Sequence, residues 1–474
     1  MSSRRRVTLG VLGGIFLAAI EGTIVATAMP TVVEQLGGLA HYSWVFAAYI
    51  LTSTVTIPLW GRLSDLYGRR RFYLAAIGLF LLGSMLSGAA QSMEQLIVFR
   101  AIQGMGAGGL LPLGMTIIGD MYTLEERARA QAWFSSVWGI ASIVGPLVGG
   151  FVTSAISWRW VFYLNLPFGA VAAYLVGSAL VDRPTSGVRI DYAGAGLLAA
   201  SVSTLLVALG QTGSRDAVLA ASTVTLLYVA AAVLLVAFLA VERRTTAPIV
   251  PLDLFANRLV SSATLTGFLV GVAMFGALAY VPLFVQSALG RSATRAGSAL
   301  TPLLLGWVGM SAITSRLVPR LGFRPMVIAG TTFVMLGFFG LTRVTHDSPM
   351  LFLYLALGVA GMGMGMCMLT LLLAQQSAVP RERLGIATSL GQFSRSIGGA
   401  VGVAIMGSVI TATLSAHGDE PAAGVLELAL HRAFVTGAIV SVVALASAFL
   451  VPSGLPLTRA SARLDESSPS TSKL

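Results

Sequence analysis

Long apolar stretches follow one another along almost the whole chain, and short polar segments separate them. A helix of about 20 apolar residues crosses a hydrocarbon core of about 30 Å, so each stretch predicts one membrane-spanning helix. Fourteen stretches have this character: 9–29, 44–61, 73–91, 96–119, 130–153, 160–180, 192–210, 217–239, 261–286, 299–319, 325–343, 351–376, 384–412 and 433–452. The pattern predicts an all-α, polytopic membrane protein.

Composition supports this interpretation. Hydrophobic residues make up 56% of the chain and charged residues only 10%, whereas a soluble domain carries about 25% charged residues. The first stretch follows Arg4–Arg6, as in a cleaved signal peptide, but it contains Glu21. A signal peptide has only about 7–15 apolar residues and does not normally hold a glutamate, so we expect the first stretch to remain as a helix.

The basic residues behind the net charge of +11 are distributed unevenly among the predicted loops. An even number of spans places both termini on one side, and most of the 30 lysine and arginine residues fall in the tails and in the loops of that side. Basic residues collect on the cytoplasmic side of a membrane, so both termini are predicted to be cytoplasmic. The charge is thus a topology signal, and we expect no nucleic-acid partner.

An internal repeat divides the chain. The segments "GRLSDLYGRR" (61–70) and "SRLVPRLGFR" (315–324) align at one offset, and other residues match at the same offset. The pairs are Arg62 and Arg316, Leu63 and Leu317, Gly68 and Gly322, Arg70 and Arg324, Arg127 and Arg381, Arg129 and Arg383, and Gly145 and Gly399. We predict two parallel six-helix halves at 1–182 and 255–455. Two extra transmembrane helices occupy the linker 183–254, and 456–474 is a disordered cytoplasmic tail.

Several motifs resemble those of one transporter family. "GRLSDLYGRRR" (61–71) is similar to the cytoplasmic signature of the major facilitator superfamily, and "RAIQGMGAGG" (100–109) to its helix 4 motif. "IEGTIVATAMP" (20–30), "GIASIVGPLVGG" (139–150), "WRWVFYLNLPFG" (158–169) and "PLDLF" (251–255) resemble segments of its fourteen-helix drug:proton antiporters. The resemblance implies the major-facilitator fold and export of amphiphilic drugs in exchange for protons. It implies a multi-pass protein of the bacterial inner membrane.

The same resemblance implies a gate at the cytoplasmic side. Arg69 would reach Asp120 and Asp65 would interact with the second half, closing that side in one state. The alternative is an ordinary basic loop. The residues implied for gating are Gly61, Asp65, Gly68, Arg69, Arg70 and Asp120.

The antiporter motif of the fifth stretch is Gly145, Pro146, Gly149 and Gly150. With Ala141, its glycines repeat every four residues and form a smooth stripe that allows close helix packing. Packing and function explain this spacing equally well, and the antiporter assignment comes from the resemblance.

Glu21 lies about 18 Å into the first predicted helix, close to mid-membrane. A carboxylate is costly there and marks a functional site by default. We predict that Glu21 faces a central polar cavity and carries the coupled proton, with Arg100 as its partner. The family usually has aspartate at this position. Two alternatives remain: a structural ion pair of Glu21 with Arg100, and an Arg100 side chain that snorkels to the interface.

Uncharged hydrogen-bonding groups and one buried arginine are predicted to line the substrate cavity: Gln103, Gln286, Gln375, Gln392 and Arg395. Two buried arginines against one buried glutamate disfavour a dedicated pump for dications. Methionines of the apolar lining suit adaptable binding or ordinary packing.

The sequence offers no catalytic, metal or nucleotide motif. Cys367 is the only cysteine, the four histidines fall outside the spans, and no phosphate-binding loop is present. We therefore predict a secondary transporter, not an enzyme, that acts without cofactor or metal. Its expected partners are an amphiphilic small molecule, protons and membrane lipids, and we expect a monomer. The alternative function is an exporter or flippase of one endogenous lipid or metabolite.

Overall fold

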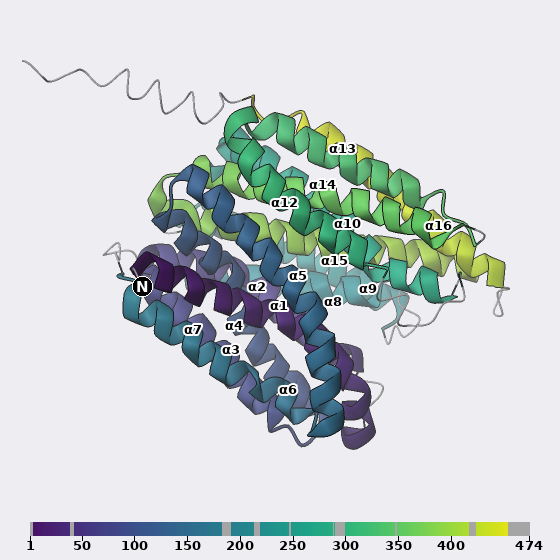
Figure 1. The fold of residues 1–474 in the computed structure, drawn as a ribbon, viewed down its shortest axis with the longest axis horizontal. Helices are drawn as coiled ribbons and strands as arrows, with labels where there is room; N and C mark the ends of the chain where they lie inside the picture. Colours follow the sequence, from purple (N-terminus) through teal and green to yellow (C-terminus); the bar gives the residue numbers. More distant parts are fainter. Residues whose placement is uncertain are drawn as a thin grey trace, which may run out of the picture.

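The structure is a computed structural model, and it describes residues 3–37, 42–182, 191–212, 219–245, 248–287, 289, 299–346, 348–416 and 423–453. The predicted tail 456–474 and parts of the linker 183–254 lie outside this range. The described part is entirely helical, as predicted (Figure 1).

The helices of the first third are α1 (Ser3–Leu36), α2 (Tyr42–Tyr67), α3 (Arg69–Gly88), α4 (Met93–Met121), α5 (Leu124–Ala155), α6 (Arg159–Tyr163) and α7 (Asn165–Ala179). Next come α8 (Tyr192–Gln211), α9 (Ala221–Glu242) and the short helix η2 (Leu252–Ala256). The last third contains α10 (Arg258–Ser287), α12 (Thr301–Leu321), α13 (Phe323–Leu341), α14 (Met350–Ser377), η3 (Arg381–Arg383), α15 (Leu384–Ser415) and α16 (Ala423–Ala448). Each predicted stretch overlaps a helix.

Twelve helical segments of the described residues are long and apolar enough to cross a membrane. The long helices α5 and α12 coincide with the predicted spans 130–153 and 299–319 but are not among these twelve. Many helices extend beyond the predicted ends, because their polar terminal turns continue the helix outside the apolar stretch.

The sixth predicted stretch is divided between α6 and α7 at Leu164. Pro167 lies in the first turn of α7, where it lacks the N–H that would bond to the carbonyl of Tyr163. Leu164 itself keeps helical dihedral angles, with φ of −56° and ψ of −28°, so α6 and α7 together form one candidate span, Arg159–Ala179, with Asn165 near its middle third.

Apolar side chains form separate cores in two groups of helices. Two buried clusters lie within residues 7–176, and the largest one extends from Ala263 to Val451. We call α1–α7 the first bundle and α10–α16 the second bundle. They meet along α2 with α15 and along α5 with α12, and their ribbons diverge toward the right of Figure 1.

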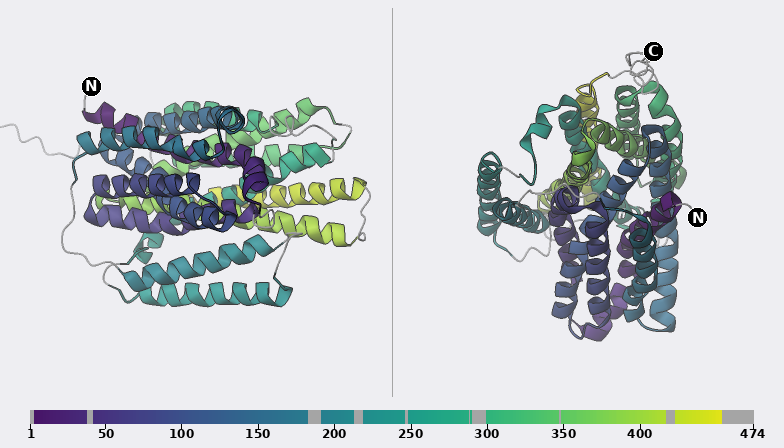
Figure 2. Two further views of the ribbon diagram at one scale, coloured as in Figure 1. Left: turned by 90° about the horizontal axis from the view of Figure 1, so that it is seen from below. Right: turned by 90° about the vertical axis from the view of Figure 1, so that its left-hand side faces the viewer.

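The helices α8 and α9 lie side by side along one flank of the bundles (Figure 2). α8 packs on α2 and α15, and a small core joins it to both bundles through Val55, Leu198 and Ile386. α9 is largely exposed and apolar on its outer side, as a lipid-facing helix would be.

The internal repeat has a structural counterpart at two glycines. Gly68 separates α2 from α3 with φ of 109°, and Gly322 separates α12 from α13 with φ of 83°. Glycine adopts this left-handed region without steric cost. The two residues that the sequence offset aligns therefore make the same sharp connection.

Candidate functional site

Glu21 is completely buried in the first bundle, where α1 faces α4 and α7. Its carboxylate forms an ion pair with Arg100 of α4. Its second oxygen accepts a hydrogen bond of 2.7 Å from the side-chain amide of Asn165 in α7. Both carboxylate oxygens are thus bound although no solvent reaches them.

The partners of Glu21 are themselves held by a wider network. Arg100 donates to Gln103 Oε1 at 2.8 Å, and its guanidinium lies 4.2 Å from the centre of the Tyr49 ring. Asn165 also donates to Ser84 Oγ at 2.9 Å. All these side chains come from the first bundle. Helix packing and hydrogen bonds together fix the carboxylate in one position.

A buried ion pair of this kind is sensitive to the loss of either charge. Removing one partner leaves an uncompensated buried charge, which costs about 3–5 kcal/mol. Protonation of Glu21 removes its charge just as a mutation does, so it would release Arg100 from its counter-ion. The expected exposure to a central cavity is not seen in this conformation, where Glu21 is closed off. The arrangement also matches the structural ion pair that the sequence left open.

Asn165 and Tyr49 contact the Glu21–Arg100 pair but were not predicted as site residues. Asn165 lies in the segment "WRWVFYLNLPFG", which carried part of the family resemblance. Its signal was present in the motif, whereas its contact with Glu21 depends on how α7 packs against α1.

Asp65 connects the two bundles. Its carboxylate accepts backbone hydrogen bonds from Gly385 at 3.0 Å and from Ile386 at 2.8 Å, at the start of α15. A helix N-terminus carries partial positive charge and unpaired N–H groups, so it binds a carboxylate well. Asp65 also pairs with Arg69 four residues later.

Arg69 extends this contact to α4 and η3. Its Nε lies 2.9 Å from Asp120 Oδ2, and its Nη2 donates to the Arg381 carbonyl at 3.3 Å. Gly61 allows the close approach of α2 to α15, because a Cβ there would lie 2.7 Å from the Gly385 carbonyl oxygen. These contacts hold one end of the interface between the bundles closed.

Gly68 and Arg70 contribute through the backbone. Gly68 supplies the left-handed connection, and the Arg70 N–H donates to Asp182 Oδ1 at 2.7 Å. Asp182, which the sequence analysis did not single out, binds the first turn of α3 and follows α7. The signature loop is therefore anchored on both sides.

The glycines of the antiporter motif pack against α1 beside Glu21. A Cβ on Gly145 would lie 2.9 Å from Thr23 Cβ, and one on Gly149 would lie 3.0 Å from the Ile24 carbonyl oxygen. Gly150 has open space at its Cβ position. The side chain of Pro146 lies outside the described residues. The stripe lets α5 approach α1.

The residues predicted for a substrate cavity are divided between the two bundles. Arg395 is buried in α15 and donates to Gln392 Oε1 at 2.6 Å. Gln375 in α14 is buried and donates to Thr264 Oγ1 at 3.1 Å. Gln103 belongs to the Glu21 network, and the side chain of Gln286 lies outside the described residues. Within the described part, no carboxylate pairs with Arg395.

Comparison with known proteins gives matches over most of the chain. Residues 11–403 match the family described as the Major Facilitator Superfamily. The multidrug transporter protein MdtP of Bacillus subtilis is 38% identical over 412 residues, which cover 87% of this chain and 76% of that protein. Multidrug resistance protein 3 of the same organism is 37% identical over 414 residues, covering 86% of this chain and 80% of that protein.

A solved structure has the same fold. The crystal structure of the human organic anion transporter MFSD10 (TETRAN) superimposes with a TM-score of 0.68. The alignment covers 95% of this chain and 99% of that one, at 14% sequence identity. At this identity the likeness concerns the arrangement of helices alone.

Proposed function

The chain belongs to the major facilitator superfamily, and from this premise we propose that it is a proton-coupled antiporter that exports amphiphilic compounds by alternating access. Its relatives at 37–38% identity are multidrug transporters by name. The transported compound would leave the cell as protons enter.

The observation that carries the coupling is the buried Glu21 with its two partners. Glu21 is paired with Arg100 and accepts a hydrogen bond from Asn165, in a place that water does not reach. When a proton binds, the carboxyl group loses its attraction for Arg100. The free energy of packing α1 against α4 and α7 then changes. Proton binding would thereby favour a different arrangement of helices, as coupled transport requires.

The contacts of Asp65 and Arg69 would act as the cytoplasmic gate. In this conformation they join α2 and α4 to the start of α15 and to η3. Transport requires that this end also opens. Because the gate depends on a few ion pairs and backbone hydrogen bonds, it can open without unfolding either bundle.

The proposed topology has fourteen spans, with both termini in the cytoplasm of a bacterial cell. The halves are 1–182 and 255–455, and the linker 183–254 supplies α8 and α9 as two further spans. The helices α5 and α12 count as spans because they pack in the centre, where the bundles meet. The protein would act as a monomer in the inner membrane.

Arg395 sets a limit on the substrate. It is a buried cation whose hydrogen-bond partner is the uncharged Gln392, so a neutral or anionic group is favoured near it over a dication. Resistance profiling of an efflux-deficient bacterium that expresses the chain tests this class. Resistance to lipophilic compounds of several structures supports multidrug export, whereas movement of one lipid or metabolite alone supports the alternative exporter or flippase.

The decisive experiment replaces Glu21 with glutamine. Glu21→Gln resembles the protonated state and keeps the shape of the side chain, so the protein should fold and bind substrate. In liposomes with an imposed proton gradient, we expect its substrate accumulation to fall at least about ten-fold. A ten-fold change in the accumulation ratio corresponds to about 1.4 kcal/mol. Glu21→Asp should keep part of the activity. Full proton-driven accumulation by Glu21→Gln would place the coupling group elsewhere.

A further inference from the structure

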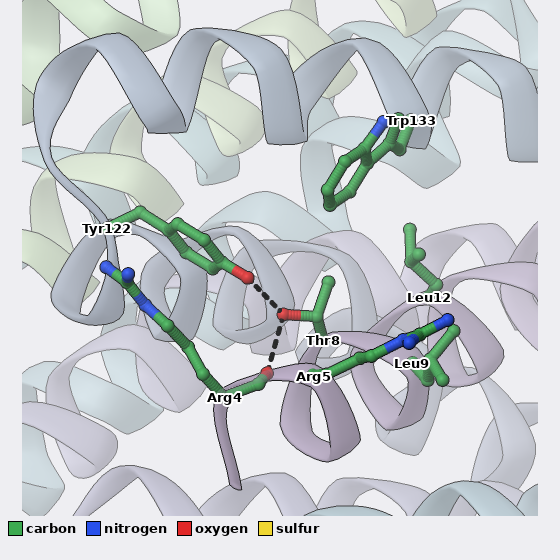
Figure 3. A pocket seen from close by; sticks show the side chains of 7 residues that line it. All are labelled: Arg4, Arg5, Thr8, Leu9, Leu12, Tyr122 and Trp133. Atoms are coloured by element: carbon green, nitrogen blue, oxygen red, sulfur yellow. Dashed lines mark hydrogen bonds between the residues drawn. The ribbon is translucent and has the colours of Figure 1, made fainter. Parts of the chain in front are cut away.

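A pocket of about 320 Å³ lies where the start of α1 meets the α4–α5 connection and the first turns of α5. Its lining residues are Arg4, Arg5, Thr8, Leu9, Leu12, Tyr122 and Trp133 (Figure 3). None of them belongs to the Glu21 network or to the gate contacts. The pocket is therefore a separate feature of the molecule.

The lining changes from charged to apolar along α1. Arg4 and Arg5 lie at the start of the helix, Thr8 follows one turn later, and Leu9 and Leu12 lie deeper. From Arg4 to Leu12 the helix rises about 12 Å. The order of charged, hydroxyl and apolar groups matches the order of head group, glycerol and acyl chain in a lipid.

The charged end is fixed in place. Arg4 donates to the Met121 carbonyl at 3.0 Å, pairs with Glu126 at 2.9 Å and stacks over the Tyr122 ring at 4.2 Å. The Thr123 backbone N–H, together with Arg4, holds the pKa of Glu126 below its usual value. Glu126 thus neutralises the Arg4 guanidinium, and Arg5 supplies the net positive charge of the pocket lining.

The apolar end opens toward the surface. The Trp133 side chain on α5 is 48% exposed and Leu9 on α1 is 42% exposed. Figure 3 shows Trp133 facing α1 across the gap, while the Tyr122 hydroxyl turns to Thr8, 2.8 Å away. Tryptophan and tyrosine favour the level of lipid head groups in membrane proteins. This end is therefore placed where head groups meet acyl chains, and its apolar side chains suit the upper part of those chains.

We propose that this pocket binds an anionic phospholipid, with its phosphate at Arg5 and its upper acyl chains against Leu9, Leu12 and Trp133. Basic pockets between membrane helices recognise anionic head groups. A zwitterionic lipid fits less well, because its cationic group is repelled by Arg5. The site goes beyond the proposed transport function, and only its assignment to the cytoplasmic leaflet depends on the proposed topology.

Binding can be measured on the purified full-length protein, without transport. Native mass spectrometry would follow retention of phosphatidylglycerol, with phosphatidylcholine and inorganic phosphate as competitors. Arg5→Gln should weaken phosphatidylglycerol binding about five-fold, the usual contribution of one basic residue at an anionic surface. The matched control is Arg320→Gln, an exposed arginine in the last turn of α12, and it should have no effect.

Three results would overturn the proposal: equal losses in Arg5→Gln and Arg320→Gln, equal retention of phosphatidylcholine, or displacement of the lipid by inorganic phosphate at similar concentration. Equal losses in the two variants would mean that the arginines attract the lipid only diffusely. Equal retention of phosphatidylcholine would mean that the head group is not recognised, and displacement by phosphate would mean that the site binds free phosphate. Equal melting temperatures of the variants would exclude misfolding as the cause.

A second measurement locates the lipid. Brominated phosphatidylglycerol, added in small excess to the protein in detergent, should quench tryptophan fluorescence by contact. Trp133→Phe should remove most of the saturable quenching. Trp160→Phe serves as the control, because Trp160 is similarly exposed at 50% but lies in α6, beyond the other end of α5. Quenching that survives Trp133→Phe and disappears in Trp160→Phe would place the lipid elsewhere and reject the site.

Discussion

At the scale of single residues, Glu21 is tolerated in an apolar helix because every oxygen of its carboxylate is bound. Arg100 supplies the counter-charge, and Asn165 supplies a neutral hydrogen bond. The neighbouring face of α1 is equally specific, because Thr23 packs against Gly145 and its hydroxyl donates to the Ala141 carbonyl at 3.2 Å. Small residues on α5 therefore determine how near α1 can lie.

The two ends of the glycine motif should respond differently to an added methyl group. Gly145→Ala places a Cβ against Thr23, whereas Gly150→Ala places one in open space. We expect Gly145→Ala to destabilise the protein by about 1–3 kcal/mol through overpacking. Gly150→Ala should be neutral or slightly stabilising, because alanine favours helix. Thermal unfolding in detergent measures both, and equal melting temperatures would show that the close α1–α5 approach is not a constraint.

How far the sequence predicts this site depends on the kind of contact. A glutamate in an apolar stretch is visible in the sequence, as is an arginine near it in depth. The bond from Asn165 is not, because it depends on where α7 begins and on how α7 packs against α1. The contact of Gln103 with Arg100 follows from their i, i+3 spacing on α4, whereas the helices that this face meets depend on helix rotation, which apolar length does not specify.

At the scale of elements, a short charged segment closes one end of the contact between α2 and α15. Asp65 binds the start of α15, and Arg69 links Asp65 to Asp120 at the end of α4. The family resemblance implied these partners. Only the structure shows that Asp65 binds the backbone N–H groups at the start of α15. Repeat symmetry explains the sharp turns at Gly68 and Gly322 but not this asymmetric charge pairing.

A double-mutant cycle tests the gate pair. Arg69→Gln and Asp120→Asn each remove one side of the same ion pair, so their effects on stability should not add. We expect a coupling energy of about 0.5–3 kcal/mol. Glu126→Gln is the control partner, because Glu126 pairs with Arg4 instead, and its effect should add to that of Arg69→Gln. Unfolding in denaturant provides the free energies, and full additivity of Arg69→Gln with Asp120→Asn would reject the pairing.

At the scale of the whole molecule, hydrophobic length predicts most of the helices and misses their interruptions. The stretches 192–210 and 384–412 correspond closely to α8 and α15, because the apolar residues end where the helices do. The stretch 160–180 contains a break that length alone cannot show, although Pro167 marks its position. Which helices cross the membrane is a further question, since the long helices α5 and α12 are not among the twelve candidate spans of the described residues.

The placement of α8 and α9 separates fourteen spans from a twelve-span arrangement with a surface hairpin. The two helices are 20 and 22 residues long, about 30 Å and 33 Å, enough to cross the membrane. The exposed side chains Val229, Val233 and Val236 suit contact with lipid. A reporter at the C-terminus cannot decide this, because either arrangement has an even number of spans. The ends of α9 can, since one should face outward and the other inward.

Single cysteines at these two ends provide the measurement. Ala220 precedes α9, Arg243 follows it, and both are exposed. The one native cysteine, Cys367, is completely buried, so it should react little with a membrane-impermeant maleimide. We expect Ala220→Cys to be labelled in intact cells with a permeable outer membrane, and Arg243→Cys to be labelled only after the inner membrane is opened. Labelling of both positions from the same side would mean that α9 does not cross the membrane, and the proposed fourteen-span topology would be wrong.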